Sequence, residues 1–490
     1  MAGEGVRETM IYLLAILGYL FLLTGVGIYK ARQVKTKADF AVAGRSLPPW
    51  ILVCTMLAAW IGTGSIVGNA GKTYETGLAA LILPWGSVIG LVILTRIAPK
   101  ARSFEVYSVP EIISLRYGQT ARLLAVIALV IAYMVIVSYQ FNAAGAVLQV
   151  ILTGKSGNSL ISVKTATIIA AVFIVTYTIL AGLLSLAYTD IVTGVIIIAT
   201  LLVALPVLWF KADGWAGMEN AFAAMGNKPN HMKFWPVYSK TQIINYCLPP
   251  FLLILGDANQ YQRFFASKNA KGAQKAVTFL IVAVLLVESL IILEAWISSS
   301  MIPNMESGKY VLIYAAKQCM PLFLGVLFLI AVVGIIISTA DSFLLIPATS
   351  VIQDVYLNYI NPKASEKRIV FLNRILVLLF GVIAYLVSLA FAESKTIFQK
   401  AMYAYTIYGS AITPCLVAAI FWKGATKQGA IASILLGTVV ALAWEEIDVV
   451  KQNLPASFSN LDAVLPAITI SILALVIVSK LTQKRASVNR

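Results

Sequence analysis

The chain has 490 residues, of which 60% are hydrophobic and only 12% are charged, and its mean hydropathy is +0.88. A soluble globular protein carries about a quarter of charged residues, so this composition excludes that class and predicts a polytopic membrane protein. The net charge of +16 does not indicate a nucleic-acid partner, because Lys and Arg fall in short clusters between apolar runs, as the positive-inside rule predicts.

The first apolar run covers residues 9–29 and is expected to be a retained transmembrane helix. It has about the twenty residues that a span needs, and Lys30 and Arg32 follow it without a small-residue cleavage site. Runs of similar length recur along the chain, and we predict thirteen spans in an all-α protein. The predicted spans are 9–29, 49–70, 77–96, 121–150, 163–181, 186–210, 242–265, 275–299, 321–349, 369–391, 396–422, 428–446 and 463–481.

Basic clusters between the spans predict the orientation. An odd number of spans places the two termini on opposite sides of the membrane, and the clusters then all fall on one side, which is the cytoplasmic side. The sequence therefore predicts a multi-pass protein of the cell membrane, embedded in the lipid bilayer, with its N-terminus outside and its C-terminus in the cytoplasm. The clusters are residues 30–37, 96–102, 263–275, 363–374, 423–427 and 480–490.

Two predicted spans are interrupted by polar residues and glycine. The stretch "WIGTGS" (Trp60 to Ser65) breaks the second span, and "GDANQ" (Gly256 to Gln260) breaks the seventh, five spans later. Such a pair is typical of an inverted-repeat transporter with its site at the midplane of the membrane. The alternative is that these glycines only allow close helix packing.

The repeat hypothesis divides a single transporter domain over residues 1–490 into four parts. The first repeat would cover residues 49–210 and the second residues 242–422. An extra N-terminal helix at 9–29 precedes them, and two C-terminal helices with a short basic tail, 428–490, follow.

A polar cluster interrupts the ninth predicted span. "ISTADS" (Ile337 to Ser342) places Ser338, Asp341 and Ser342 on one face of a helix. An ionisable residue at membrane depth is costly, so Asp341 is a candidate functional residue.

Several motifs together resemble one known family. "GRSLPPW" (Gly44 to Trp50), "LAYTD" (Leu186 to Asp190), "ISTADS" and the stretch Asn259 to Ala276 are similar to segments of the sodium:solute symporter family, which has the LeuT-type fold of five plus five helices. The local motifs are most similar to the choline-transporting branch. The resemblance implies sodium-coupled secondary active symport of a small organic solute.

The resemblance also implies a sodium site. It would use the carbonyl groups of Ala58, Ile61 and Ile335 and the hydroxyl groups of Ser338 and Thr339. An unwound membrane segment supplies carbonyl groups that no helical hydrogen bond has taken, which suits a hard cation. The alternative is that both hydroxyls bond back to the preceding helical turn.

A second cation site is a candidate in some members of the family. Here it would draw on Asp190, Ser338, Asp341 and Ser342. Two neighbouring carboxylates repel unless a cation or a proton lies between them, so a proton-coupled symporter using Asp190 and Asp341 is an alternative. A further alternative is that Asp341 forms an ion pair with a basic residue near the cytoplasmic exit and has a structural role instead of binding an ion.

Substrates of this fold bind between the interrupted helices, but the sequence does not identify the solute. Asp257 stands where the choline branch has a cage Trp, so an amino acid such as proline is an alternative to a quaternary amine, and carboxylates and sugars are also carried in the family. The predicted lining residues are Trp60, Thr63, Tyr139, Gln140, Asp257, Asn259, Gln260, Tyr261, Tyr405 and Tyr408.

Other classes of function are less consistent with the pattern. A cation channel would need a continuous polar stripe, whereas the polar residues here cluster at two breaks; a sensor that has lost transport is the related alternative. The single histidine, His231, lies in a polar loop and no nucleophile motif is present, so an enzyme is not expected. The partners expected are the solute, sodium and lipid, with a monomer as the working unit.

Overall fold

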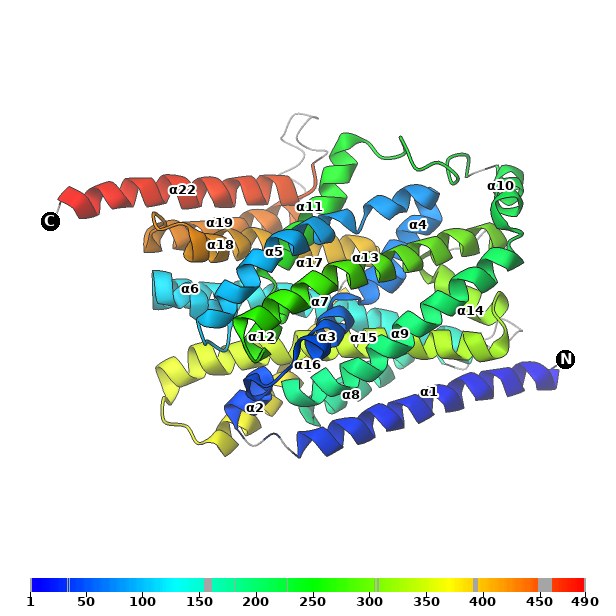
Figure 1. The fold of residues 1–490 in the computed structure, drawn as a ribbon, viewed down its shortest axis with the longest axis horizontal. Helices are drawn as coiled ribbons and strands as arrows, with labels where there is room; N and C mark the ends of the chain where they lie inside the picture. Colours follow the sequence, from blue (N-terminus) through cyan, green and yellow to red (C-terminus); the bar gives the residue numbers. More distant parts are fainter. Residues whose placement is uncertain are drawn as a thin grey trace.

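The computed structural model describes residues 2–32, 34, 36–153, 161–180, 182–226, 228–303, 305, 308–390, 395–447 and 461–488. These residues fold into helices, and most of the long ones run along or at a moderate slant to the long axis of the molecule (Figure 1). The helices are α1 (Ala2–Ala31), α2 (Lys37–Val42), α3 (Pro49–Trp60), α4 (Ala70–Thr76), α5 (Trp85–Ser103), α6 (Val109–Tyr117), α7 (Gln119–Leu152), α8 (Val163–Leu180), α9 (Leu183–Lys211), α10 (Gly214–Met225), α11 (Lys240–Gly256), α12 (Ala258–Ala266), α13 (Ala270–Met301), α14 (Val311–Gln318), α15 (Leu322–Ser350), α16 (Glu366–Ala390), α17 (Ile397–Ala411), α18 (Thr413–Phe421), α19 (Lys427–Glu446) and α22 (Val464–Val488). Helical turns also cover Gly64–Asn69, Gly77–Ile82 and Val351–Ile360.

Each run predicted to span the membrane is a helix or a broken helix. Within the described residues, ten helices are long and apolar enough to cross a membrane, and a bent pair, Pro49–Trp60 with Gly64–Ile82, raises the number to eleven. Helix α5 and the short pair α11 and α12 are not among them. The number thirteen therefore stays a prediction.

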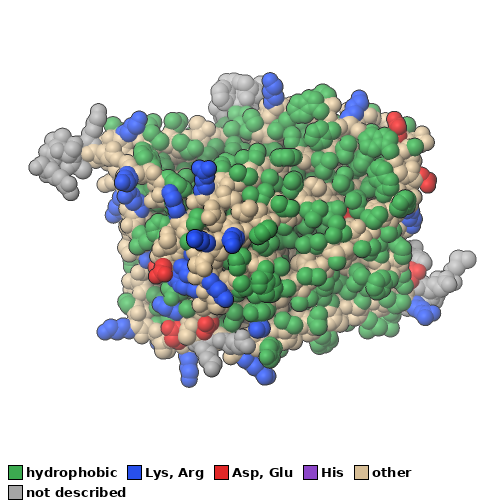
Figure 2. All heavy atoms as spheres, viewed as in Figure 1, with side chains coloured by type: hydrophobic (Ala, Val, Ile, Leu, Met, Phe, Trp, Pro, Cys, Tyr) green, Lys and Arg blue, Asp and Glu red, His purple; other side chains and the backbone are tan. Residues whose placement is uncertain are grey.

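The placement of the chain ends and charges agrees with what the predicted orientation requires. Helix α1 begins at one end of the bundle and α22 ends at the other (Figure 1). Lys and Arg side chains gather toward the end where α22 finishes, and hydrophobic side chains cover much of the remaining face (Figure 2). The sidedness itself stays a prediction.

The helix packing follows the pattern of a five-helix repeat. Helix α9 packs along α3, and its counterpart α17 packs along α11. The counterparts α5 and α13, α7 and α15, and α8 and α16 also pack against each other in pairs. Two related halves joined face to face give this arrangement, although the predicted repeat boundaries, 49–210 and 242–422, are not tested by it.

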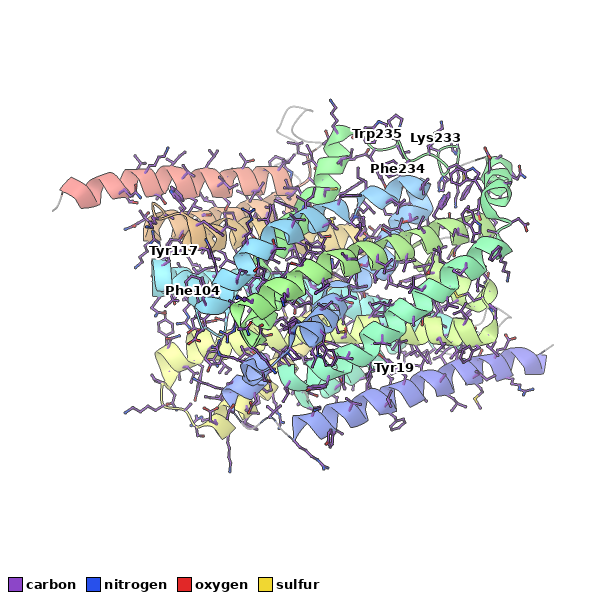
Figure 3. The ribbon with its side chains drawn as sticks, in the orientation of Figure 1. Tyr19, Phe104, Tyr117, Lys233, Phe234 and Trp235 are labelled. Atoms are coloured by element: carbon purple, nitrogen blue, oxygen red, sulfur yellow. The ribbon has the colours of Figure 1, made fainter. Side chains whose placement is uncertain are left out.

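Helix α1 lies on the outside of the bundle and is anchored by a tyrosine. Tyr19 sits on the side of α1 that faces the other helices (Figure 3), and its hydroxyl lies 2.9 Å from the hydroxyl of Thr193 on α9. Most of the large hydrophobic residues elsewhere on α1, such as Phe21, are exposed, which suits contact with lipid.

Candidate functional site

The first helix break exposes backbone groups in the middle of the bundle. Helix α3 ends at Trp60, Ile61 adopts an extended conformation, and helical turns resume at Gly64 in a direction bent by 50°. The carbonyl groups of the last turn of a helix lack intrahelical partners. Ala58 and Ile61 therefore present their carbonyl oxygens to α15.

Four oxygens from the break and from α15 converge, all on buried residues. Ser338 donates a hydrogen bond to the carbonyl of Ala58 at 2.8 Å, and the hydroxyl of Thr339 lies 3.3 Å from the same carbonyl and 3.1 Å from that of Ile61. Oxygens that ligate one cation of sodium's size stand about 3 Å apart, so this spacing fits such an ion. Ile335, the fifth predicted ligand, is buried on α15 one turn before Ser338.

Gly62 allows the break to approach α15 this closely. A Cβ atom at this position would lie 2.9 Å from the methyl carbon of Thr339 and 3.1 Å from both its hydroxyl and the amide nitrogen of Gln140. A side chain at residue 62 would therefore push the carbonyls of the break away from Thr339.

A second cluster lies one to two turns away and contains its own cation. Asp190 on α9 accepts a hydrogen bond from Thr55 at 2.5 Å, and the guanidinium group of Arg263 lies 3.7 Å from the same carboxylate oxygen. Arg263 also donates to Ser342 at 2.8 Å and to the carbonyl of Asn259 at 3.1 Å.

Arg263, the first residue of one predicted basic cluster, is buried. We counted Arg263 in the cytoplasmic basic cluster 263–275, but its side chain is 0% exposed and lies on α12 within the bundle. The later lysines of that cluster, Lys268, Lys271 and Lys275, have exposed side chains. Arg263 was not proposed as a site residue.

The residues of the predicted second cation site have different partners. Ser338 faces Ala58, Ser342 faces Arg263, and Asp341 accepts a hydrogen bond from Thr178 on α8 at 2.5 Å. The second carboxylate oxygen of Asp341 has no hydrogen-bond partner within the described part of the chain. The alternative in which Asp341 pairs with a basic residue receives no support from the ion pairs of the described residues, where Arg263 joins Asp190 instead.

The second helix break is held by side chains that we had expected to line the substrate site. The carboxylate of Asp257 caps α12 by accepting from the backbone N–H of Asn259 at 3.1 Å, and it accepts from Tyr133 at 2.5 Å. The hydroxyl of Tyr408 bridges the break, because it donates to the carbonyl of Gly256 at 2.8 Å and accepts from the N–H of Ala258 at 3.0 Å.

Other predicted lining residues are also engaged with the protein. Gln260 donates to the carbonyl of Met56 at 3.3 Å, and Tyr261 donates to the carbonyl of Leu255 at 3.0 Å. Asn259 contacts Arg263, and Gln140 accepts from the hydroxyl of Thr63 across the first break.

A cavity reaches toward the first break from the end predicted to be extracellular. An outer vestibule of about 1000 Å³ lies between α4, α11 and α17, and a deeper cavity of about 30 Å³ lies beneath it. Tyr246, Phe398 and Met402 line both spaces. The vestibule therefore leads into the deeper cavity.

Two predicted lining residues, Trp60 and Tyr405, form a wall of the deeper cavity. Their rings stack with centroids 6.4 Å apart and planes 24° apart. Tyr139, which belongs to α7, lies beside Tyr405 of α17. The other residues of the predicted lining are not part of this cavity wall.

Sequence reasoning missed the acidic residue of this cavity. Glu288 on α13 accepts from Ser65 at 2.5 Å and from the side-chain amide of Asn69 at 3.0 Å. It lies within the apolar run predicted as span 275–299, where an intramembrane carboxylate is the signal that could have found it.

Comparison with known proteins identifies the relatives of this chain. A model of the Sodium:solute symporter family matches residues 40–437. The osmoregulated proline transporter OpuE of Bacillus subtilis is 26% identical over 481 residues, which cover 96% of this chain and 94% of that protein. A sodium/proline symporter of Staphylococcus aureus is 24% identical over 488 residues, with 95% and 92% covered.

Solved structures share the fold. A Na⁺-coupled sialic acid symporter in a substrate-bound outward-open state matches with a TM-score of 0.80 at 15% identity and covers 96% of this chain and 97% of its own. MhsT in complex with L-phenylalanine matches with a TM-score of 0.57 at 13% identity, covering 87% and 97%. These likenesses confirm the predicted LeuT-type fold.

Proposed function

The chain belongs to the sodium:solute symporter family, and we propose that it imports a small amino acid such as proline with sodium held by Ser338 and Thr339. It is a multi-pass transporter of the cell membrane and not an enzyme, and Na⁺ is its coupling ion. The resemblance stated from sequence alone is thereby confirmed at the level of the family.

One observation carries the sodium assignment. Three hydrogen bonds of 2.8 to 3.3 Å join the oxygens of Ala58, Ile61, Ser338 and Thr339. None of these four groups is charged. Such a neutral oxygen cluster can exchange its internal hydrogen bonds for a monovalent ion. A small adjustment of α15 and of the break at Ile61 would bring in the carbonyl of Ile335 as the fifth sodium ligand.

The position of this cluster suggests how sodium acts on transport. The ion would tie the broken helix α3 to α15, so it would favour the conformation in which these elements are close. A solute that binds the same conformation would then bind more tightly when sodium is present. By linkage, sodium would also bind more tightly when the solute is present.

The proposed solute follows from the relatives and from the wall of the deeper cavity. Two of the most similar relatives are named as proline transporters. Trp60 and Tyr405 line the inner end of the path from the vestibule, and the vestibule itself has room for a small amino acid. A single chain contains both the ion cluster and the cavity, so we propose the monomer as the working unit.

A second cation at Asp341 is a subsidiary proposal. Its favouring observation is the carboxylate oxygen of Asp341 that has no hydrogen-bond partner among the described residues, next to the hydroxyl of Thr178. Asp190 is already compensated by Arg263, so Asp341 is the better candidate of the two carboxylates for a cation or a proton.

Uptake into proteoliposomes tests the proposed function. We expect L-proline uptake to follow an inward sodium gradient at constant pH, and a proton gradient without sodium to drive none. Thr339→Val and Ser338→Ala should reduce the sodium-driven uptake about tenfold or more, whereas the matched variants Thr349→Val and Ser350→Ala, on the same helix but outside the cluster, should not. Uptake that ignores the sodium gradient would contradict the proposal.

A further inference from the structure

Glu288 occupies an unusual position in the middle of α13. Its side chain is buried, and its two carboxylate oxygens accept hydrogen bonds only from neutral groups, the hydroxyl of Ser65 and the side-chain amide of Asn69. Across the described ranges, no ion pair joins Glu288 to a basic side chain. A buried carboxylate without a counter-ion is unfavourable. Glu294 on the same helix also lacks one, and Glu288 differs from it in lining a cavity that a cation can enter from the vestibule.

The volume of the cavity next to Glu288 limits the size of the cation that can bind there. The deeper cavity has a volume of about 30 Å³. One water needs about 10 to 15 Å³ on this measure, so the space holds about two waters. It is therefore large enough for an ammonium group but too small for a trimethylammonium group or for a whole solute.

The aromatic residues around the cavity match the same chemistry. The rings of Trp60 and Tyr405 stack at its wall, and those of Tyr246 and Phe398 stand where the cavity meets the vestibule. The faces of aromatic rings attract cations, and the effect is larger where water is excluded. A charged nitrogen here would have the carboxylate of Glu288 and several aromatic rings among its neighbours.

We propose that the deeper cavity binds the protonated amino nitrogen of the transported solute, with Glu288 as its counter-ion. The rest of the solute would extend past Phe398 toward the vestibule, which has ample volume for it. The substrate class is then a primary or secondary amine, including amino acids, and it excludes sugars and simple carboxylates. This inference rests on the proposed symport function and narrows its solute.

Asp257 does not supply this counter-ion. One of its oxygens caps α12 and accepts from Tyr133, and the residue is not in the wall of either the vestibule or the deeper cavity. The counter-ion of the proposal is therefore Glu288, which lines the deeper cavity.

Matched solutes test the inference on the purified wild-type protein. The probes are L-proline, cyclopentanecarboxylate, which replaces the nitrogen of proline by carbon, and glycine betaine, which has a quaternary nitrogen. We measure the thermal midpoint of unfolding against probe concentration in sodium chloride. We expect L-proline to stabilise at concentrations about tenfold or more below those of both analogues.

Two outcomes of this comparison would overturn the inference. The first is equal stabilisation by L-proline and cyclopentanecarboxylate, because the nitrogen would then contribute nothing. The second is that no amine stabilises the protein in a wider set of L-proline, glycine, L-alanine and 4-aminobutyrate, or that glucose or acetate does so better.

A variant with a matched control assigns the effect to Glu288. Glu288→Gln should abolish the preference for L-proline over cyclopentanecarboxylate. Glu294→Gln, six residues further along α13 and equally buried but outside the cavity wall, should retain it. A Glu288→Gln protein that is folded and keeps the full preference would overturn the inference.

The readouts separate this inference from the proposed function. If the amine preference persists when potassium replaces sodium without loss of affinity, sodium coupling fails while Glu288 keeps its role. If a sodium gradient drives the uptake of an uncharged solute, sodium coupling stands and the role of Glu288 is wrong.

Discussion

Two buried polar clusters join the first broken helix to α15, and they differ in how their charge is balanced. In the proposed sodium cluster, the carbonyls of Ala58 and Ile61 meet the hydroxyls of Ser338 and Thr339 with no charged group among them. In the arginine cluster, residues Thr55, Asp190, Arg263 and Ser342, a carboxylate is matched by a guanidinium group.

This difference decides which cluster can accept an ion. A neutral set of oxygens gains favourable interactions when a cation enters, whereas a set that already holds an arginine would have to place two cations side by side. The comparison predicts that the first cluster responds to sodium and that the second responds to the loss of its own charges.

The largest expected effect comes from removing the internal cation. Arg263→Gln leaves Asp190 buried without its partner, so we expect the free energy of unfolding to fall by about 3 to 5 kcal/mol. Denaturant unfolding in detergent measures the loss. Combining Arg263→Gln with Asp190→Asn removes both charges and should restore a large part of it; a double variant as unstable as the single one would show that the pair is not the source.

A smaller effect should follow from crowding the break. Gly62→Ala places a methyl group 2.9 Å from a carbon of Thr339, and we expect a destabilisation of about 1 to 3 kcal/mol with a weaker response to sodium. The thermal midpoint with and without sodium measures both. Gly18→Ala on α1, where a Cβ meets nothing within 4 Å, is the control and should keep the full response to sodium without any loss of stability.

Single hydroxyl deletions on α15 sharpen the comparison further. Ser338→Ala should raise the sodium concentration at half-maximal stabilisation by about tenfold, which corresponds to about 1.4 kcal/mol, because a ligand oxygen is lost. Ser342→Ala, one turn away in the arginine cluster, should lower the stability at all sodium concentrations but leave that midpoint within about twofold. The opposite pattern would mean that the two clusters had been assigned the wrong way round.

The smallest expected effect is on a titratable group outside both clusters. Burial, with a further contribution from the positive charge of Lys228, lowers the pKa of His231, whose ring nitrogen lies 3.0 Å from the carbonyl of Tyr74. Below the ordinary histidine pKa of about 6.5, the unfolded chain takes up a proton that the folded chain resists, so stability should decline slightly as the pH falls from 7 to 5.

A variant without the ring isolates this contribution. His231→Gln should flatten the pH dependence between pH 5 and 7 without changing the sodium midpoint. A change in the response to sodium would instead connect the loop to the ion site.

The helices could be predicted from sequence because membrane length and apolar runs leave few alternatives. The two breaks were also visible, since glycine and polar residues at Trp60–Ser65 and Gly256–Gln260 interrupt otherwise apolar segments. Sequence pattern did not give the bend of 50° or the number of complete spans, because both depend on how helices pack and where each one ends.

Sequence could not show which side chains near a break face the cavity, because side-chain direction at an unwound segment does not follow helical periodicity. Asp257, Tyr261 and Tyr408 stand near the break as expected, yet their polar groups satisfy backbone groups rather than face the cavity. Arg263 and Glu288 were missed for opposite reasons. The first looked like part of a cytoplasmic basic cluster, and the second lay in an apolar run.

Binding of radioactive sodium to the purified protein tests the central assignment most directly. We predict that the combined Ser338→Ala and Thr339→Val variant loses sodium binding that the wild type shows, and that the combined Asp190→Asn and Arg263→Gln variant retains it. Sodium binding that survives in the first variant and disappears in the second would contradict the account.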